Sequence, residues 1–194
     1  MKRLIVLLCG LAALLCGCAA ESGDTRAEEL QRRCGEVNGY AATAYVTVAD
    51  RDESRQYRLD VRHEGDETRL TVLEPEEIAG IVAVISGDAL SLDFEGTVLA
   101  AGSAGTDLSA VNGADVVMRA AASGYITEQN YERYEGTDAL RLCFETELNG
   151  ETLYVTAYFD SEDRPLYAEI ERQGDVLQYL EFTDFVFGDI VDAE

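Results

Sequence analysis

Residues 140–150 have the sequence LRLCFETELNG, in which apolar and polar side chains alternate before the stretch ends in Asn149-Gly150. Successive side chains of a β-strand point to opposite faces of the sheet, so this alternation predicts a strand that is buried on one face and hydrated on the other. Asn-Gly is a strong signal for a two-residue hairpin, because a type I′ turn needs positive φ at both central residues. The segment therefore predicts an antiparallel β-hairpin.

The same pattern continues outward along the chain in both directions. Apolar residues alternate with polar ones around Leu59 and again around Leu92, and turn dipeptides separate the stretches: Glu64-Gly65, Gly87-Asp88, Glu95-Gly96, Glu135-Gly136 and Gln173-Gly174. The spacing predicts about 10–11 strands, which is too many for a flat sheet to be covered by one short helix. We therefore expect the sheet to curl.

A helix is predicted near the N-terminal end of this meander, over residues 27–37. Leu30, Cys34 and Val37 recur on one face, and Thr25 is suited to the N-cap position. A second helix is predicted to begin after Asn112 and to end at Gly124, midway through the strands.

The predicted fold class is therefore mainly β (α+β). We expect a curled antiparallel sheet or half-open β-barrel, with an N-terminal helix and one mid-chain helix, as a single domain over residues 26–194.

The first twenty residues are typical of a bacterial lipoprotein leader. Lys2 and Arg3 precede an apolar run at 4–15 that is too short to span a membrane. Leu15-Cys16-Gly17-Cys18 resembles the lipobox, which implies diacylglycerol on the Cys18 thiol and cleavage after Gly17. We expect a signal peptide at 1–17 and a lipid-anchored tether at 18–25, with ordinary secretory cleavage near Ala19 as the alternative.

Such a protein is extracytoplasmic, held at the outer face of the cell membrane or, in a diderm host, at the outer membrane. The composition excludes one class of binding partner. The chain has 38 acidic residues and 15 basic ones, which give a formal net charge of −23. This surface repels phosphate backbones, so nucleic-acid binding is excluded. The hydrophobic fraction of 47% indicates a packed core rather than a disordered acidic tail.

Three stretches carry a resemblance to a known family. Residues 73–81 look like a strand that ends in a proline turn, residues 158–170 place Asp160 and Pro165 between two strands, and residues 182–185 space two phenylalanines in a last strand. Together with the lipobox and the element order, they resemble the LolA/LolB-like lipoprotein-carrier fold. The layout is also similar to the GerS-type germination lipoproteins of spore-forming bacteria.

This resemblance implies a half-open barrel whose concave apolar face holds acyl chains or is plugged by helices. The candidate lining residues are inward-facing side chains of the predicted strands: Leu59, Val61, Leu92, Phe94, Leu142, Phe144 and Phe159. The alternative is that they are ordinary core residues beneath the helices. Residues 100–110, rich in Gly, Ala and Ser, predict either a protruding loop with Leu108 at its apolar tip or a simple connector.

Catalytic motifs do not occur in the sequence. His63, the single histidine, precedes the predicted Glu64-Gly65 turn and is expected to be exposed there. We find no nucleophile elbow, zinc-protease motif or phosphate loop, and we expect a non-enzymatic protein. The expected cofactor and metal content is none, apart from the covalent lipid on Cys18.

Two sets of acidic residues are expected to face solvent. Asp93 and Glu95 are expected on a solvated strand face. Asp160, Glu162 and Asp163 have calcium-binding chemistry, but their spacing lacks the features of an EF-hand loop and favours a solvated turn.

Cys34 and Cys143 can form a disulfide in an oxidising compartment. Cys34 belongs to the apolar face of the helix, whereas Cys143 shares a strand face with Arg141 and Glu145, which favours the alternative of two separate thiols with Cys34 buried.

Two functions are compatible with these observations. In the first, which we favour, the half-barrel binds an apolar ligand, a lipid or a lipoprotein acyl chain, at the membrane surface. In the second, the barrel is plugged and the protein, as a monomer or an edge-paired dimer, docks a cell-envelope or cell-wall enzyme. The anchor on Cys18 argues against a soluble shuttle in either case.

Overall fold

The structure, a computed structural model, describes residues 25–49, 53–87, 89–103 and 108–188. It contains helices α2 (Thr25–Glu36) and α3 (Gly113–Ser123) and the short 3₁₀ helix η1 (Glu76–Ile78). The strands are β1 (Gly39–Ala49), β2 (Ser54–Glu64), β3 (Glu67–Glu74), β4 (Val82–Ser86), β5 (Ala89–Phe94), β6 (Thr97–Ser103), β7 (Tyr125–Tyr134), β8 (Thr137–Leu148), β9 (Glu151–Phe159), β10 (Pro165–Arg172) and β11 (Asp175–Phe187).

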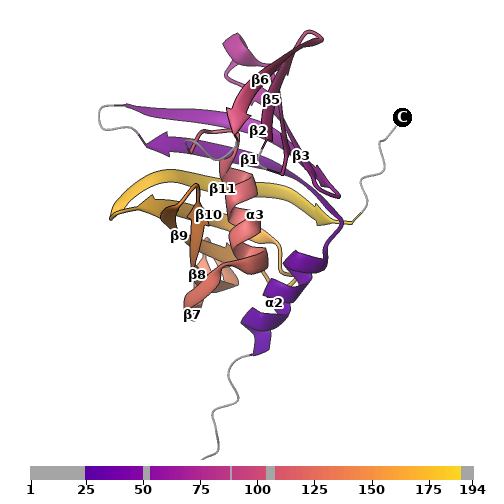
Figure 1. Cartoon of the computed structure of the whole chain (residues 1–194). Helices are drawn as coiled ribbons and strands as arrows, with labels where there is room; N and C mark the ends of the chain where they lie inside the picture. The colour runs from indigo at the N-terminus through magenta and orange to yellow at the C-terminus, as the bar shows by residue number, and fades with distance from the viewer. Residues whose placement is uncertain (1–24, 50–52, 88, 104–107, 189–194) are drawn as a thin grey trace, which may run out of the picture.

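All strands belong to one 11-stranded antiparallel sheet, in the order β6-β5-β4-β3-β2-β1-β11-β10-β9-β8-β7. The first and last strands pair at its centre, and consecutive strands β6 and β7 form its two edges. The chain therefore crosses the concave side of the sheet once, and α3 lies on that crossing (Figure 1). The predicted curled half-barrel with two helices is confirmed.

The hairpin predicted from Asn149-Gly150 is also confirmed. β8 and β9 pair from Leu148↔Glu151 onward, and φ is positive at both central residues, 52° at Asn149 and 79° at Gly150. Glu135 and Gly136 have the same signs of φ in the turn between β7 and β8. The type I′ pattern thus sets the register of neighbouring strands in the second half of the sheet.

The two helices fill the concave face. On α3, the buried residues run from Gly113 to Met118 and include Ala120 and Ala121, and the helix contacts β8, β9, β10 and β11. The small side chains of α3 allow close approach to the sheet, where Phe144 and Phe159 pack edge to face at 6.4 Å between ring centroids. α2 packs against α3 through Ala27, Leu30 and Cys34.

The helix boundaries differ from the predicted ones by one or two residues. Asn112 occupies the N-cap position of α3, as predicted, but its side chain does not cap the helix. Its Oδ1 instead accepts a hydrogen bond from the Ser109 N–H at 2.8 Å, which orders the approach to the helix.

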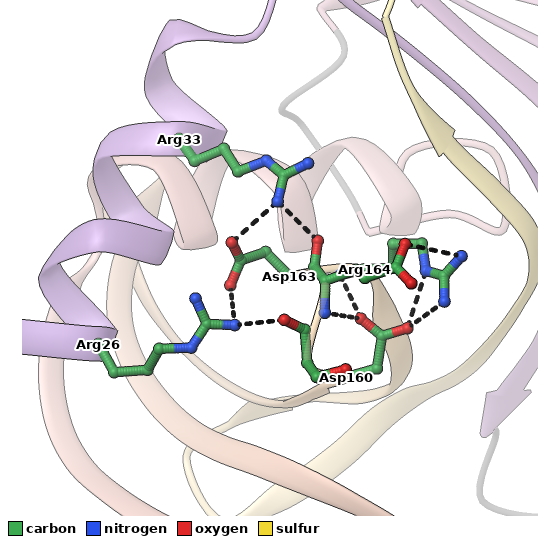
Figure 2. Close-up of polar contacts among 7 residues, drawn as sticks. Arg26, Arg33, Asp160, Asp163 and Arg164 are labelled. Atoms are coloured by element: carbon green, nitrogen blue, oxygen red, sulfur yellow. Dashed lines mark hydrogen bonds and ion pairs between the residues drawn. The ribbon is translucent and has the colours of Figure 1, made fainter.

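α2 is fixed to the turn between β9 and β10 by ion pairs (Figure 2). The carboxylate of Asp163, which is 5% exposed, pairs with Arg26 at 2.6 Å and with Arg33 at 3.0 Å. The Arg33 guanidinium also lies 4.6 Å from the centroid of the Phe187 ring, a cation–π contact. In the same turn Asp160 accepts hydrogen bonds from the Glu162 and Arg164 N–H groups and pairs with the Arg164 side chain at 2.7 Å.

The prediction of a solvated Asp160–Asp163 turn is therefore wrong for these two residues. Both carboxylates are buried because arginines from α2 and from the turn itself neutralise them. Glu162 keeps the expected exposure.

We expect Asp163→Asn to lower the free energy of unfolding by about 1–3 kcal/mol, because it removes the charge that holds two arginines of α2. Asparagine tolerates the positive φ of 65° at this position, so backbone strain does not contribute. Urea denaturation followed by circular dichroism measures the loss. The matched control is Arg32→Ala, which breaks the exposed Arg32–Glu36 pair on the same helix and is expected to change stability by less than about 0.5 kcal/mol. Equal losses in the two variants would contradict this account of α2 docking.

Candidate functional site

A cleft of about 290 Å³ opens between the two helices and strands β1–β4. Its apolar wall consists of side chains from α2, α3, β1 and β4, together with the residue that follows α2: Cys34, Val37, Tyr40, Ile85, Met118 and Ala122. A concave site with mostly apolar walls and a few polar groups is the usual form of a small-molecule site.

The polar floor of the cleft is a hydrogen-bonded chain of four residues. Arg119 Nε lies 2.7 Å from Asp115 Oδ2, and the Thr68 hydroxyl donates to Asp115 Oδ1 at 3.2 Å. His63 Nδ1 lies 2.9 Å from the same Thr68 oxygen. Because the Thr68 proton is directed to Asp115, the proton on neutral His63 belongs on Nδ1, which leaves Nε2 as an acceptor.

Burial shifts the pKa values of this chain in opposite directions. It raises the pKa of the Asp115 carboxyl, an effect that the Arg119 charge partly offsets. Burial lowers the pKa of His63, and the Asp115 charge opposes this shift. The neutral imidazole stacks on Tyr40 at 4.9 Å between ring centroids, and Tyr40 stacks in turn on Phe185 at 5.5 Å.

The predicted exposed position of His63 is therefore wrong. His63 has the same strand parity as Leu59 and Val61, so its ring points to the inner face, where it lies opposite Thr68 in the register of β2 and β3. The Glu64-Gly65 signal placed the turn correctly but gave no indication that α3 brings Asp115 to the same point.

The predicted lining residues have different positions. Five of them have 0% exposure and belong to the core beneath α2 and α3: Leu59, Val61, Leu142, Phe144 and Phe159. Leu92 is half-buried, and Phe94, at the end of β5, is 48% exposed. None of the seven lines the cleft. The five buried ones are part of the packed core, whereas Leu92 and Phe94 lie on β5, away from the cleft.

Leu108 is half-buried against the core rather than exposed at a loop tip. Residues 104–107 of the predicted loop lie outside the described residues, as do the predicted leader, its cleavage site and Cys18.

Cys34 and Cys143, the cysteines of the described residues, are both free thiols. Cys34 lies on the inner side, where burial raises its pKa to about 12 and makes the thiol unreactive. Cys143 lies on the outer face of β8, with Sγ 3.7 Å from Glu128 and 3.5 Å from Thr156. The sheet separates the two sulfurs, so the disulfide alternative does not hold in this structure.

Within the described ranges, no group of three or more His, Cys, Asp or Glu side chains is arranged to hold a metal ion. Asp93 accepts a hydrogen bond from the Gly96 N–H at 3.1 Å and so shapes the turn that contains Glu95.

Among the residues that the structure describes, no helix is both long and apolar enough to cross a membrane.

The lowered pKa of His63 predicts a pH dependence of stability. As the pH falls, His63 of the unfolded chain binds a proton near its ordinary pKa of 6.5, whereas His63 of the folded chain binds one only at lower pH. The free energy of unfolding therefore falls as the pH drops below about 6.5. The slope contributed by one group is at most about 1.4 kcal/mol per pH unit. Asp115, with its raised pKa, acts in the opposite direction as the pH falls toward its ordinary pKa of 3.8.

We expect His63→Asn, which retains a donor for Thr68 but does not titrate, to lose this dependence between pH 7 and pH 5.5. Urea titrations at several pH values give the two slopes. Since His63 is the single histidine, identical slopes in wild type and variant would show that the ring is not held neutral.

Comparisons with known proteins extend the description of the fold. No protein-family model matches the sequence, and no curated protein sequence matches it. Solved structures do match. A domain from Vibrio parahaemolyticus, described as belonging to an outer membrane lipoprotein-sorting protein, aligns with a TM-score of 0.53 at 14% identity, over 86% of this chain and 93% of that one.

An uncharacterised conserved protein of Thermus thermophilus aligns with a TM-score of 0.51 at 14% identity, over 86% of this chain and 90% of that one. A LolA superfamily protein of Nitrosomonas europaea aligns with a TM-score of 0.48 at 13% identity, over 89% of this chain and 96% of that one. The chain has a LolA-like fold, as the sequence resemblance predicted.

Proposed function

We propose that this is a non-enzymatic protein of the bacterial envelope that binds one apolar chain in the cleft between α2, α3 and strands β1–β4. The observation that carries the proposal is the composition of this cleft, which combines an apolar wall with a polar floor. A fatty acid, a lipid or the acyl chain of a lipoprotein has matching chemistry, with one apolar chain and one polar end.

The apolar wall supplies the affinity. Burial of one methylene group stabilises a complex by about 0.8 kcal/mol. A few methylene groups of the ligand, packed against Val37, Ile85 and Met118, would therefore contribute a substantial part of the binding free energy. At the polar end, the Arg119 guanidinium is suited to donate hydrogen bonds to an ester or carboxylate oxygen, and His63 Nε2 is suited to accept one from a hydroxyl group.

The membrane anchor is part of the same proposal. A diacylglycerol on Cys18 would hold the domain at the membrane, since two acyl chains anchor a protein far more firmly than one. The anchored site would then bind chains presented at that surface and would not carry them between membranes.

We expect Cys18→Ser to abolish metabolic labelling by a palmitate analogue and to move the protein from the membrane fraction to the soluble extracytoplasmic fraction. Cys143→Ser is the control and is expected to leave both labelling and fractionation unchanged. Labelling that persists in Cys18→Ser would rule out this thiol as the attachment point.

Occupancy of the cleft can be tested with the domain from residue 19 to residue 194. We expect native mass spectrometry to detect a bound species of a few hundred daltons that solvent extracts as lipid. Ala122→Phe, which places a ring in the cleft, is expected to lower the bound fraction at least about tenfold, since a filled cleft excludes the chain.

Ser123→Phe is the matched control, because Ser123 is the next residue of α3 and is exposed outside the cleft. A clean apo mass for the wild-type domain, or equal occupancy in the two phenylalanine variants, would contradict binding in this cleft.

The alternative function is docking of an envelope protein by a plugged half-barrel. One observation favours it: α2 and α3 fill the concave face, so that most of the apolar strand residues are closed to ligand. A clean apo mass in the experiment above would support this alternative.

A further inference from the structure

The face of the sheet that points away from α2 and α3, here called the outer face, carries a row of aromatic and charged side chains. The register aligns Tyr158 of β9 with Tyr167 of β10, Tyr167 with Glu181 of β11, and Glu181 with Tyr45 of β1. These four strands are neighbours in the sheet (Figure 1). Directly opposed residues on one face have Cβ atoms about 4.5–5.5 Å apart, so the side chains of the row are in mutual reach.

Glu181 lies among tyrosines in this row. Tyr45 and Tyr167 flank it on the two neighbouring strands, and Tyr179 precedes it by two residues on the same face of β11. Tyr134 stacks on Tyr167 at 5.2 Å between ring centroids. Burial raises the pKa of Tyr134, and the charge of Glu181 contributes to this shift, which is consistent with Glu181 lying close to that ring as well.

Within the described residues no ion pair joins the Glu181 carboxylate to a cation, which is also true of Glu145 and Glu147 on the outer face, whereas some other acids of this face do have partners. Glu128 pairs with Arg141 at 3.2 Å, Glu74 pairs with Arg58 at 3.3 Å, and Glu169 accepts a hydrogen bond from the Tyr167 hydroxyl at 2.7 Å. Glu181 is exposed, so its charge is available to a molecule that approaches the outer face.

A shallow hollow of about 210 Å³ lies beside this carboxylate. Tyr45, Tyr179 and Glu181 line it, together with Thr47 and Gln56. Arg58, which lies opposite Tyr45 in the register of β1 and β2, also lines the hollow, and its charge is paired with that of Glu74 beside it. The hollow, the rings and the carboxylate therefore form one surface, called here the tyrosine site and defined by Tyr45, Tyr167, Tyr179 and Glu181.

The chemistry of the tyrosine site matches a guanidinium group. Tyrosine faces attract cations within about 6 Å of the ring centroid, and arginine stacks on such rings through its planar group. A carboxylate accepts two parallel N–H bonds from the same fork, which is the strong form of this hydrogen bond. The net charge of −23 further attracts a basic partner to this surface.

We propose that the tyrosine site binds an arginine side chain from a basic segment of a partner protein, with Glu181 as the anion and the tyrosine rings as the stacking surface. The site lies on the face opposite the cleft and does not depend on the occupancy of the cleft. The protein would thus engage an envelope partner on its outer face whether or not it holds an apolar chain.

The test uses the full chain in a non-ionic detergent and a fluorescein-labelled nonapeptide with three arginines separated by glycine and serine. The matched probe replaces each arginine with citrulline, which has nearly the same shape and no charge. We expect saturable binding of the arginine peptide, measured by fluorescence anisotropy, and no binding of the citrulline peptide. Absence of saturable binding at up to about 1 mM peptide overturns the proposal.

Two pairs of variants separate the site from the general charge of the protein. We expect Glu181→Gln to weaken binding of the arginine peptide about tenfold. Glu147→Gln removes an equal charge from β8, also on the outer face of the sheet, and we expect it to change binding less than about twofold. We expect Tyr45→Ala to weaken binding at least about threefold and Tyr45→Phe, which keeps the ring, to bind like the wild type.

Equal weakening by Glu181→Gln and Glu147→Gln would mean that the peptide responds only to the net charge of the protein, and this result overturns the proposal. Displacement of the peptide by phosphocholine, with stronger binding of phosphocholine than of the peptide, assigns the site to a lipid headgroup and also overturns it.

Discussion

The packing of α3 into the concave face is the interaction on which the rest of the structure depends. The sheet is too wide to fill its own interior, and a helix with buried Ala114, Ala120 and Ala121 can approach it closely enough to exclude water. The same helix lies on the connection between the two edge strands, β6 and β7. Asp115 is carried into the interior by this packing, and the chain Arg119–Asp115–Thr68–His63 satisfies the buried carboxylate.

Alternation along the strands then gives the two faces different chemistry. Inner side chains are apolar and pack in the core. The exception is the cleft near His63, where α2 and α3 leave a space. Outer side chains of β9 and β11 are mainly tyrosine, glutamate and threonine, which remain hydrated and available to partners. A fold that resembles lipoprotein-sorting proteins thus separates a candidate lipid site from a candidate protein site by the thickness of one sheet.

Local sequence patterns were sufficient for most of the fold. Alternation at Leu140–Leu148 and the Asn149-Gly150 turn predicted β8, β9 and their register, because both signals act within a few residues. The site was harder to predict, because its contacts join distant residues: Asp163 meets Arg33 across 130 residues, and Thr68 meets Asp115 across 47. The parity of His63 with Leu59 and Val61 was a usable signal for its inward direction. The outer tyrosines gave no comparable signal, because an exposed tyrosine becomes informative only when its cross-strand neighbours are known.

The ion pairs between α2 and the turn at 160–164 have a mechanical consequence. If Cys18 carries the lipid, any tension between the membrane and the domain enters the fold through α2, whose first turn contains Arg26. The load then reaches the contacts of Arg26 and Arg33 with Asp163 before it reaches β1. Yielding would begin with the sliding of a helix over charged contacts that can re-form, and the backbone hydrogen bonds of the sheet would be spared.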